Sequence, residues 1–113
     1  MRIVVAENDP DALELLLVDL RFEGHDIVGT AADGETAFEL CRRLHPDVCI
    51  LDFRMPPGPN GLATAARLRA AQPAMRVVIY SNYMQGWIRD QARAIGVRFL
   101  VKGNLQALRQ AVK

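Results

Sequence analysis

The chain has 113 residues, of which 50% are apolar and 24% are charged, and its formal net charge is +1. A chain of this length forms one ordinary domain and is too short for two, and its composition is typical of globular proteins. Its apolar runs are shorter than the roughly 18 to 20 residues of a membrane span, and the N-terminus lacks the zones of a signal peptide. We therefore exclude disordered and membrane-spanning proteins and expect a cytoplasmic protein without membrane contact.

The near-zero net charge combines two halves of opposite sign. Up to Pro56 the chain carries five basic and twelve acidic residues, a net charge of −7, whereas the remainder carries nine basic residues and Asp90, a net charge of +8. The basic half has no cluster of Lys and Arg interleaved with aromatic residues, so we do not expect this segment to bind nucleic acid directly. Its arginines form either a solvated mixed surface or a surface that meets an acidic partner.

The apolar pattern changes period repeatedly along the chain, and turn or capping residues mark each change. Short apolar runs predict strands, and apolar residues at helical spacing predict helices. The expected strands are 2–6, 26–30, 48–51, 77–80 and 97–101. The expected helices start at Pro10, after Asp33, at 62, at 85 and at 105, with Asp9, Asp33 and Asn60 as N-caps. The Pro- and Gly-rich stretch 55–61 is expected to be a loop.

This alternation of strands and helices predicts a (βα)5 arrangement of the α/β class. Strands that are apolar on both faces indicate a parallel sheet that is covered by helices on both sides, because right-handed crossovers place the helices there. In such sheets the ligand site lies at the carboxyl ends of the strands, near the point where the strand order reverses. The residues that follow the strands are therefore the first candidates for function.

Polar side chains follow four of the five expected strands. They are Glu7, Asn8 and Asp9 after the first strand, Asp52 after the third, Ser81 and Asn82 after the fourth, and Lys102 after the fifth. Each residue alone is most often a turn, capping or solubilising residue. Together, at the same end of a parallel sheet, they predict the convergence of three or four carboxylates, one hydroxyl and one amine.

Crowded carboxylates repel one another, so this arrangement favours a bound divalent cation, and its oxygen donors suit Mg²⁺. Lys102 is one of only two lysines among fourteen basic residues, and its ammonium group suits a phosphoryl oxygen. Asp52 follows the central apolar strand and precedes the flexible loop. We therefore expect Asp52 to be the nucleophile that accepts a phosphoryl group as an acyl phosphate.

These residues resemble the receiver domain of two-component response regulators, and the resemblance covers the whole chain. The stretches that carry it are Glu7-Asn8-Asp9-Pro10, Asp52-Phe53-Arg54-Met55-Pro56, Asn60-Gly61, Ser81, and Gly96 followed by Phe99-Leu100-Val101-Lys102. The resemblance implies a flavodoxin-like (βα)5 fold with three layers and a five-stranded parallel sheet. It also implies a role in two-component or phosphorelay signal transduction.

The resemblance implies that Asp52 is phosphorylated by the phosphohistidine of a sensor histidine kinase or of a phosphotransfer protein. Mg²⁺ would be held by Glu7, Asn8, Asp52 and the backbone carbonyl of Arg54, and Lys102 would contact the phosphoryl group. Further partners would be an effector domain or protein and a second copy in a homodimer. The domain would not turn over an external substrate and is therefore not expected to be an enzyme.

The resemblance also implies a conformational switch. Ser81 would move toward the phosphoryl group, and Phe99 would follow into the space that it leaves. The face formed by the fourth helix, the fifth strand and the fifth helix would carry the signal.

Three departures from the family pattern limit what the resemblance implies for this chain. Asn8 stands where the family usually has a second metal-binding acid, and Gly103 replaces the usual proline, which predicts a trans and more mobile peptide at that position. Three residues, Pro57, Gly58 and Pro59, lengthen the loop over the site by one. Asn8 favours the alternative of a pseudo-receiver, a binding module that signals without phosphorylation.

A second alternative is a small Mg²⁺-dependent phosphatase. It is disfavoured because Arg54 stands where such an enzyme needs a second acid, and because the chain leaves no room for a cap domain.

The start of the fourth helix carries three large apolar residues, Tyr83, Met84 and Trp87. Ile88 and the apolar residues after it already supply an inward-facing stripe, so Trp87 is expected to lie off this stripe and to be exposed. An exposed aromatic residue at this position is a candidate anchor for a partner.

We expect residues 1–113 to form a single receiver domain. Its last helix is short for the fold, and the chain ends inside it. A stand-alone receiver and a receiver cut from a longer protein both fit this pattern.

Overall fold

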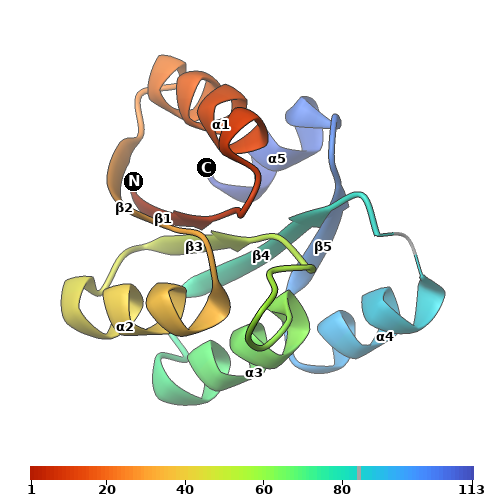
Figure 1. The fold of residues 1–113 in the computed structure, drawn as a ribbon. Coiled ribbons are helices and arrows are strands. Elements are labelled where there is room, and N and C mark those ends of the chain that lie inside the picture. Colours follow the sequence, from red (N-terminus) through yellow and green to blue (C-terminus); the bar gives the residue numbers. More distant parts are fainter. Residues whose placement is uncertain (84) are drawn as a thin grey trace.

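A computed structural model describes residues 1–83 and 85–113, so that Met84 lies outside the described residues. Over these ranges, five strands alternate with five helices, as predicted (Figure 1). The strands are β1 (Arg2–Ala6), β2 (Asp26–Ala31), β3 (Val48–Leu51), β4 (Arg76–Ser81) and β5 (Arg98–Val101). The helices are α1 (Pro10–Phe22), α2 (Gly34–Leu44), α3 (Gly61–Ala71), α4 (Gly86–Ala94) and α5 (Leu105–Ala111).

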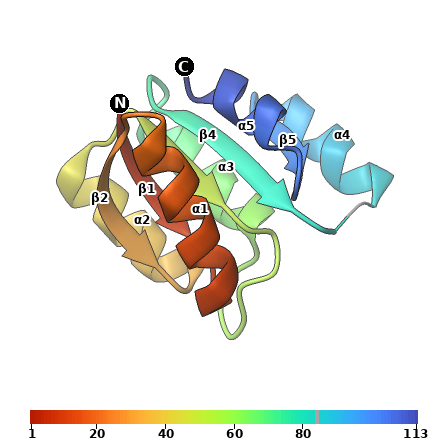
Figure 2. The ribbon, with the colours of Figure 1, turned by 90° about the horizontal axis from the view of Figure 1, so that it is seen from above.

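The strands form a parallel sheet in the order β2-β1-β3-β4-β5. From β1 the chain first moves to one edge and then, from β3 onward, to the other, so the strand order reverses between β1 and β3. Helices α1 and α5 cover one face of the sheet, and α2, α3 and α4 cover the other (Figures 1 and 2). This three-layer α/β arrangement is the predicted fold class.

The core has two layers because successive side chains of each strand point to opposite faces. In β1, Ile3 and Val5 pack with Leu20 of α1 in one layer, and Val4 and Ala6 belong to the other. The second layer is completed by α2, α3 and α4 through Ala37, Cys41, Ala65, Leu68, Ile88 and Ala92. Strands that face two apolar layers must be apolar on both sides, which explains their continuous apolar runs.

The predicted caps are confirmed. The side chain of Asp9 accepts a hydrogen bond from a backbone N–H at the start of α1, as Asp33 does for α2 and Asn60 for α3. Asn104 caps α5 in the same way, and this cap was not predicted. Each cap satisfies one of the N–H groups that a helix start leaves without a partner.

The element bounds differ from the predicted ones by a few residues at most. The fifth strand begins at Arg98 rather than Val97, because Val97 N–H donates a hydrogen bond to the Ala92 carbonyl at 2.8 Å and so closes α4. Gly96, with φ of 76°, turns the chain between the two elements. In the described parts of the chain, no helix is long and apolar enough to cross a membrane.

Candidate functional site

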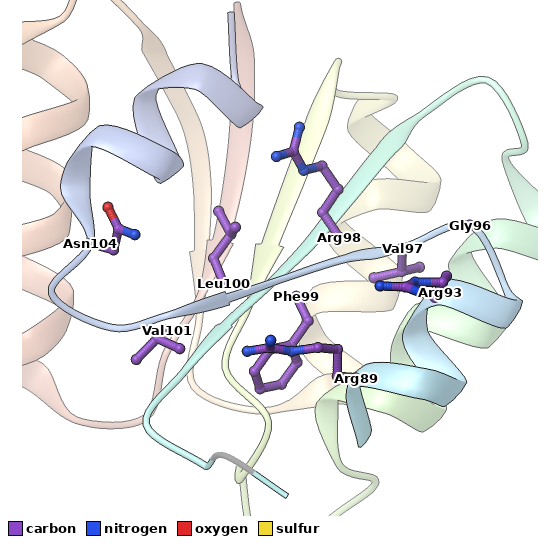
Figure 3. A pocket seen from close by; sticks show the side chains of 9 residues that line it. All are labelled: Arg89, Arg93, Gly96, Val97, Arg98, Phe99, Leu100, Val101 and Asn104. Atoms are coloured by element: carbon purple, nitrogen blue, oxygen red, sulfur yellow. The ribbon is translucent and has the colours of Figure 1, made fainter. Parts of the chain in front are cut away.

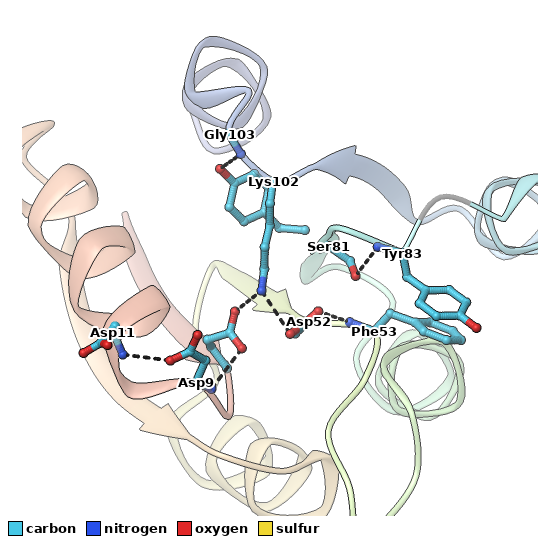
Figure 4. A network of polar contacts seen from close by, with 10 residues as sticks. Asp9, Asp11, Asp52, Phe53, Ser81, Tyr83, Lys102 and Gly103 are labelled. Carbon is cyan, nitrogen blue, oxygen red and sulfur yellow. Dashed lines mark hydrogen bonds and ion pairs between the residues drawn. The ribbon is translucent and has the colours of Figure 1, made fainter.

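The carboxyl ends of four strands meet at one edge of the sheet (Figure 4). Glu7 follows β1, Asp52 follows β3, Ser81 is the last residue of β4, and Lys102 follows β5. The hydrogen bonding of the sheet continues to these positions: Asp52 N–H donates to the Ala6 carbonyl at 2.9 Å, and Lys102 N–H donates to the Ser81 carbonyl at 3.1 Å. The sheet itself therefore brings these four residues together.

The Lys102 ammonium group lies between two buried carboxylates. Its Nζ donates a hydrogen bond to Asp52 Oδ2 at 3.1 Å and forms an ion pair with Glu7. Glu7 is 4% exposed and Asp52 is 9% exposed. Their remaining oxygens accept backbone hydrogen bonds, Glu7 Oε2 from Asp9 N–H at 3.2 Å and Asp52 Oδ1 from Phe53 N–H at 2.7 Å. Both carboxylates are thus held by local backbone and by one shared cation.

The electrostatics of this triad reflect burial and pairing together. Burial raises the pKa of Glu7 above its usual range, the hydrogen bond from Lys102 works to lower that pKa, and the neighbouring Asp52 raises it further. Burial works to lower the pKa of Lys102, but its hydrogen bonds to Glu7 and Asp52 outweigh burial and raise it. Lys102 is therefore a fixed positive charge at neutral pH.

Of the three or four carboxylates predicted to converge, the structure joins two, Glu7 and Asp52, through Lys102. Across residues 1–83 and 85–113, no group of three or more Asp, Glu, His or Cys side chains is arranged so that it could hold a metal ion. The reason is the start of α1: Asp9 Oδ1 accepts a hydrogen bond from Asp11 N–H at 3.1 Å, which turns the Asp9 carboxylate toward the helix. The two carboxylates that do meet are Glu7 and Asp52.

The donors around this pair are of the kind that Mg²⁺ takes. The Glu7 and Asp52 carboxylates lie together, Asn8 is exposed beside Glu7, and Arg54 follows two residues after Asp52. Carboxylates, amide oxygens and backbone carbonyls are hard oxygen ligands, and Mg²⁺ needs one or two carboxylates and completes its shell with water and phosphate oxygens. The residues present therefore fit a magnesium ion, with one formal charge fewer than a third acid would supply.

An aromatic cluster borders the Asp52 side of the site. Ser81, 2% exposed, accepts a hydrogen bond from Tyr83 N–H at 3.1 Å. The Tyr83 ring stacks on Phe53 with centroids 5.2 Å apart, and Trp87 meets Phe53 edge-on at 6.2 Å. The prediction that Trp87 lies off the buried stripe is confirmed, since it is 51% exposed while Ile88 is fully buried. Phe53 was missed, although an aromatic residue directly after Asp52 in a Pro- and Gly-rich loop was a visible signal.

The two predicted switch residues lie on neighbouring strands. Phe99 of β5 pairs with Ile79 of β4, and Val101 pairs with Ser81. Phe99 and Val101 are two residues apart in one strand, so they point to the same face of the sheet, and Ser81 shares that face as a diagonal neighbour of Phe99. Phe99 is half-buried, with the Arg89 guanidinium 5.6 Å from its ring centroid.

The turn after Lys102 depends on Gly103. Gly103 has φ of 95°, and its N–H donates a hydrogen bond to the Tyr80 hydroxyl at 2.9 Å. In the described residues the cis peptide bond is at Pro56-Pro57, so the predicted trans bond before Gly103 is confirmed. The role of Tyr80 was missed, although a tyrosine in an otherwise apolar buried strand needs a partner for its hydroxyl.

Replacing Gly103 with proline is expected to lower the free energy of unfolding by about 3 kcal/mol. Proline fixes φ near −65°, and it has no N–H to donate to the Tyr80 hydroxyl. Gly103→Ala keeps the N–H and is expected to cost only about 1 kcal/mol for the positive φ. Urea denaturation of both variants measures the difference. Equal stability of the proline variant and the parent would contradict this account of the turn.

Comparisons with known proteins identify the family and agree with this fold. Residues 3–113 match the family described as the response regulator receiver domain. NarL of Mycobacterium tuberculosis, described as a probable transcriptional regulatory protein, is 36% identical over 104 residues, covering 90% of this chain and 48% of NarL. The oxygen regulatory protein NreC of Staphylococcus haemolyticus is 33% identical over 84 residues, covering 74% of this chain and 39% of NreC.

Solved structures give the same result. The receiver domain of Mycobacterium tuberculosis NarL superposes with a TM-score of 0.87 at 34% identity, covering 98% of this chain and 95% of that one. For the fold alone, a chain of the CheX-CheY complex from Borrelia burgdorferi gives a TM-score of 0.91 at 22% identity, covering 99% of this chain and 86% of that one. The chain belongs to the receiver domain family of two-component response regulators. It spans about half the length of NarL and less of NreC.

Proposed function

We propose that this domain is a phosphoacceptor switch that receives a phosphoryl group on Asp52. The observation that carries the proposal is the position of Asp52 at the carboxyl end of β3. One of its carboxylate oxygens accepts a hydrogen bond from Phe53 N–H, and the other accepts one from Lys102. An Asp52 oxygen attacks phosphorus, the bond from phosphorus to the donor's histidine nitrogen breaks, and that nitrogen keeps the electron pair. The product is an aspartyl phosphate.

The neighbouring residues have separate roles in this transfer. Lys102 already contacts Asp52, so its ammonium group can pair with an oxygen of the transferred group. Bound Mg²⁺ would offset the negative charge of the phosphoryl oxygens, held by Glu7, Asn8, Asp52 and the backbone carbonyl of Arg54.

The response to phosphorylation involves the neighbouring strands. The Ser81 hydroxyl would bond the phosphoryl group, and Phe99 would change its position on the same face of the sheet. Because the phosphoryl group adds charge and acceptor oxygens at one point, it can shift the balance between two arrangements of these residues. The face of α4, β5 and α5 would then present a different surface, with Tyr83 and Trp87 at its start.

The cellular setting is part of the same proposal, and the family supports it. The donor is a sensor histidine kinase or a phosphotransfer protein, and the receiver, residues 1–113, acts in the cytoplasm. The output is an effector domain or protein, as the transcriptional regulatory NarL suggests, and homodimer formation is one route to it. We expect no turnover of an external substrate.

The second candidate is a pseudo-receiver, which signals without phosphorylation. Asn8 favours it, because the amide supplies no charge where the family uses an acid, and because the remaining acid Glu7 is already paired with Lys102. Changing Asn8 to aspartate is expected to tighten Mg²⁺ binding, since a second charge is added next to Glu7. A weak magnesium site would slow phosphorylation without preventing it.

The test is the mass of the protein after incubation with acetyl phosphate and Mg²⁺. We expect a gain of one phosphoryl group that disappears in the Asp52→Asn variant and with a chelator, and that persists in Asp90→Asn, which changes an exposed acid on α4. Asn8→Asp should reach the same phosphorylation at a lower Mg²⁺ concentration. Absence of any modification dependent on Asp52, in the parent and in Asn8→Asp, would establish the pseudo-receiver instead.

A further inference from the structure

A groove of about 510 Å³ runs along β5 between α4 and α5, on the edge of the sheet (Figure 3). Its lining includes three exposed arginines, Arg89 and Arg93 from α4 and Arg98 from β5. Arg89 lies over the Phe99 ring on one side of the strand, and Arg98 extends from the other side. The groove is therefore positively charged on both faces of the strand.

The fold does not use these three arginines as it uses most others. Six of the nine other arginines donate guanidinium hydrogen bonds to carboxylates or to backbone carbonyls, namely Arg2, Arg42, Arg67, Arg69, Arg76 and Arg109, whereas Arg21, Arg43 and Arg54 do so nowhere in the described residues. Arg89, Arg93 and Arg98 differ from those three because they line one groove. Within the described residues, Arg89, Arg93 and Arg98 form neither an ion pair nor a guanidinium hydrogen bond. Asp90 is the sole acid after Pro56, so their charge has little local compensation.

The backbone at the groove is also open. In the described sheet β5 pairs with β4 alone and forms an edge, which leaves N–H and C=O groups on its outer side. Charged side chains often protect such an edge from unwanted pairing. Strand β5 has four residues, and three arginines without a carboxylate partner surround it, which is more charge than protection of the edge requires. These arginines favour a negatively charged segment as the partner of this edge.

We propose that this groove is a docking site for an acidic, extended polypeptide segment of another protein or domain. The segment adds to the edge of β5 through main-chain hydrogen bonds, and its carboxylates pair with Arg89, Arg93 and Arg98. The groove lies on the α4, β5 and α5 face, so the inference rests on the proposed role of that face in output and adds the chemistry of the partner. It does not depend on phosphorylation of Asp52.

Two other ligands of the groove are disfavoured, a second copy of this chain and single-stranded nucleic acid. A symmetric contact with a second copy would place the arginines against arginines, with Asp90 as the lone acid of α4 to offset them. Single-stranded nucleic acid binds on stacking aromatic rings, and the ring in this groove, Phe99, is half-buried and covered by Arg89. An acidic polypeptide satisfies both the charges and the open backbone.

The experiment measures binding of a fluorescein-labelled peptide of eight alternating Glu and Val residues to the unphosphorylated chain by fluorescence anisotropy. A peptide of alternating Lys and Val is the probe control. We expect binding of the acidic peptide that weakens with added salt and falls about tenfold or more in Arg93→Glu and in Arg98→Glu. Arg43→Glu is the matched variant, because Arg43 and Arg93 are exposed basic residues in the last turns of their helices, and it should bind as the parent does.

Three results would overturn the proposal. They are equal binding of the basic and acidic peptides, unchanged binding in Arg93→Glu and Arg98→Glu, and tighter binding of a single-stranded oligonucleotide than of the acidic peptide. Self-association of the parent that Arg93→Glu abolishes, measured by sedimentation, would assign the groove to a second copy. Because every arm uses unphosphorylated protein, failure here leaves the proposal for Asp52 untouched.

Discussion

Replacing Gly61 with alanine is expected to lower the free energy of unfolding by roughly 2 to 3 kcal/mol and to impair phosphorylation of Asp52. A Cβ atom at Gly61 would lie 2.2 Å from the backbone oxygen of Asp52 and 3.0 Å from the Phe53 Cα. Gly61 N–H also donates to the Phe53 carbonyl at 2.7 Å, so the start of α3 is fixed against the loop that follows β3. Backbone cannot yield as a flexible side chain does, and the helix must move away.

The matched control is Gly58→Ala in the loop that precedes α3, where a Cβ would meet nothing within 4 Å. Urea denaturation should place the Gly58 variant within about 0.5 kcal/mol of the parent. Phosphorylation by acetyl phosphate should slow in Gly61→Ala and stay unchanged in Gly58→Ala. If both alanine variants behave alike, the close approach of α3 to Asp52 does not position the phosphoacceptor.

Replacing Lys102 with methionine is expected to lower the free energy of unfolding by roughly 2 to 3 kcal/mol at neutral pH in the presence of a chelator. The change leaves the buried Glu7 and Asp52 carboxylates facing each other without their shared cation. Breaking a fully buried ion pair costs more, but the Lys102 side chain is 20% exposed and water screens part of the loss. Phosphoryl transfer should slow as well, because Lys102 is the cation next to Asp52.

The loss should depend on pH through Glu7. Burial and Asp52 already raise the pKa of Glu7, and removal of Lys102 takes away the contact that lowers it. A carboxyl group whose pKa is raised by folding contributes its stability below its unfolded pKa of about 4.3 and loses it as the pH rises through the folded value. The deficit of Lys102→Met should therefore be larger at about pH 7.5 than at about pH 4.5.

Two further variants isolate this effect. Lys113→Met removes the other lysine of the chain, which is exposed, and should leave stability unchanged at both pH values. The double variant Lys102→Met with Glu7→Gln removes the repulsion together with the cation and should regain much of the lost stability. A deficit that is independent of pH and is not rescued by Glu7→Gln would refute the electrostatic explanation.

Most of the fold could be predicted from the sequence because local signals and packing agree. Asp9, Asp33 and Asn60 marked helix starts by their side-chain chemistry, and each forms the expected hydrogen bond. The bounds were less certain where a single backbone bond decides them. Val97 has a strand-forming side chain, yet its N–H closes α4, and no side-chain pattern reports that choice.

The meeting of Glu7, Asp52 and Lys102 could be predicted because parallel strands deliver their ends to one edge. What the sequence could not show was competition for each side chain. The sequence predicted two roles for Asp9, a place in the carboxylate cluster and the N-cap of the first helix. In the structure its carboxylate accepts a hydrogen bond from Asp11 N–H, which holds it at the helix start. The contact between Tyr80 and Gly103 joins residues 23 positions apart across two strands, which requires the register of the sheet.

The strand order also separates negative from positive charge across the sheet. The acidic first half of the chain supplies β2 and β1 at one side of the sheet, and the basic second half supplies β4 and β5 at the other. Opposite charges at opposite edges form a dipole, which rotates the domain in the field of an approaching charged protein before contact. Productive collisions then become more frequent at low ionic strength. A positively charged partner should associate faster at the acidic side of the sheet, and a negatively charged partner should associate faster at the basic side.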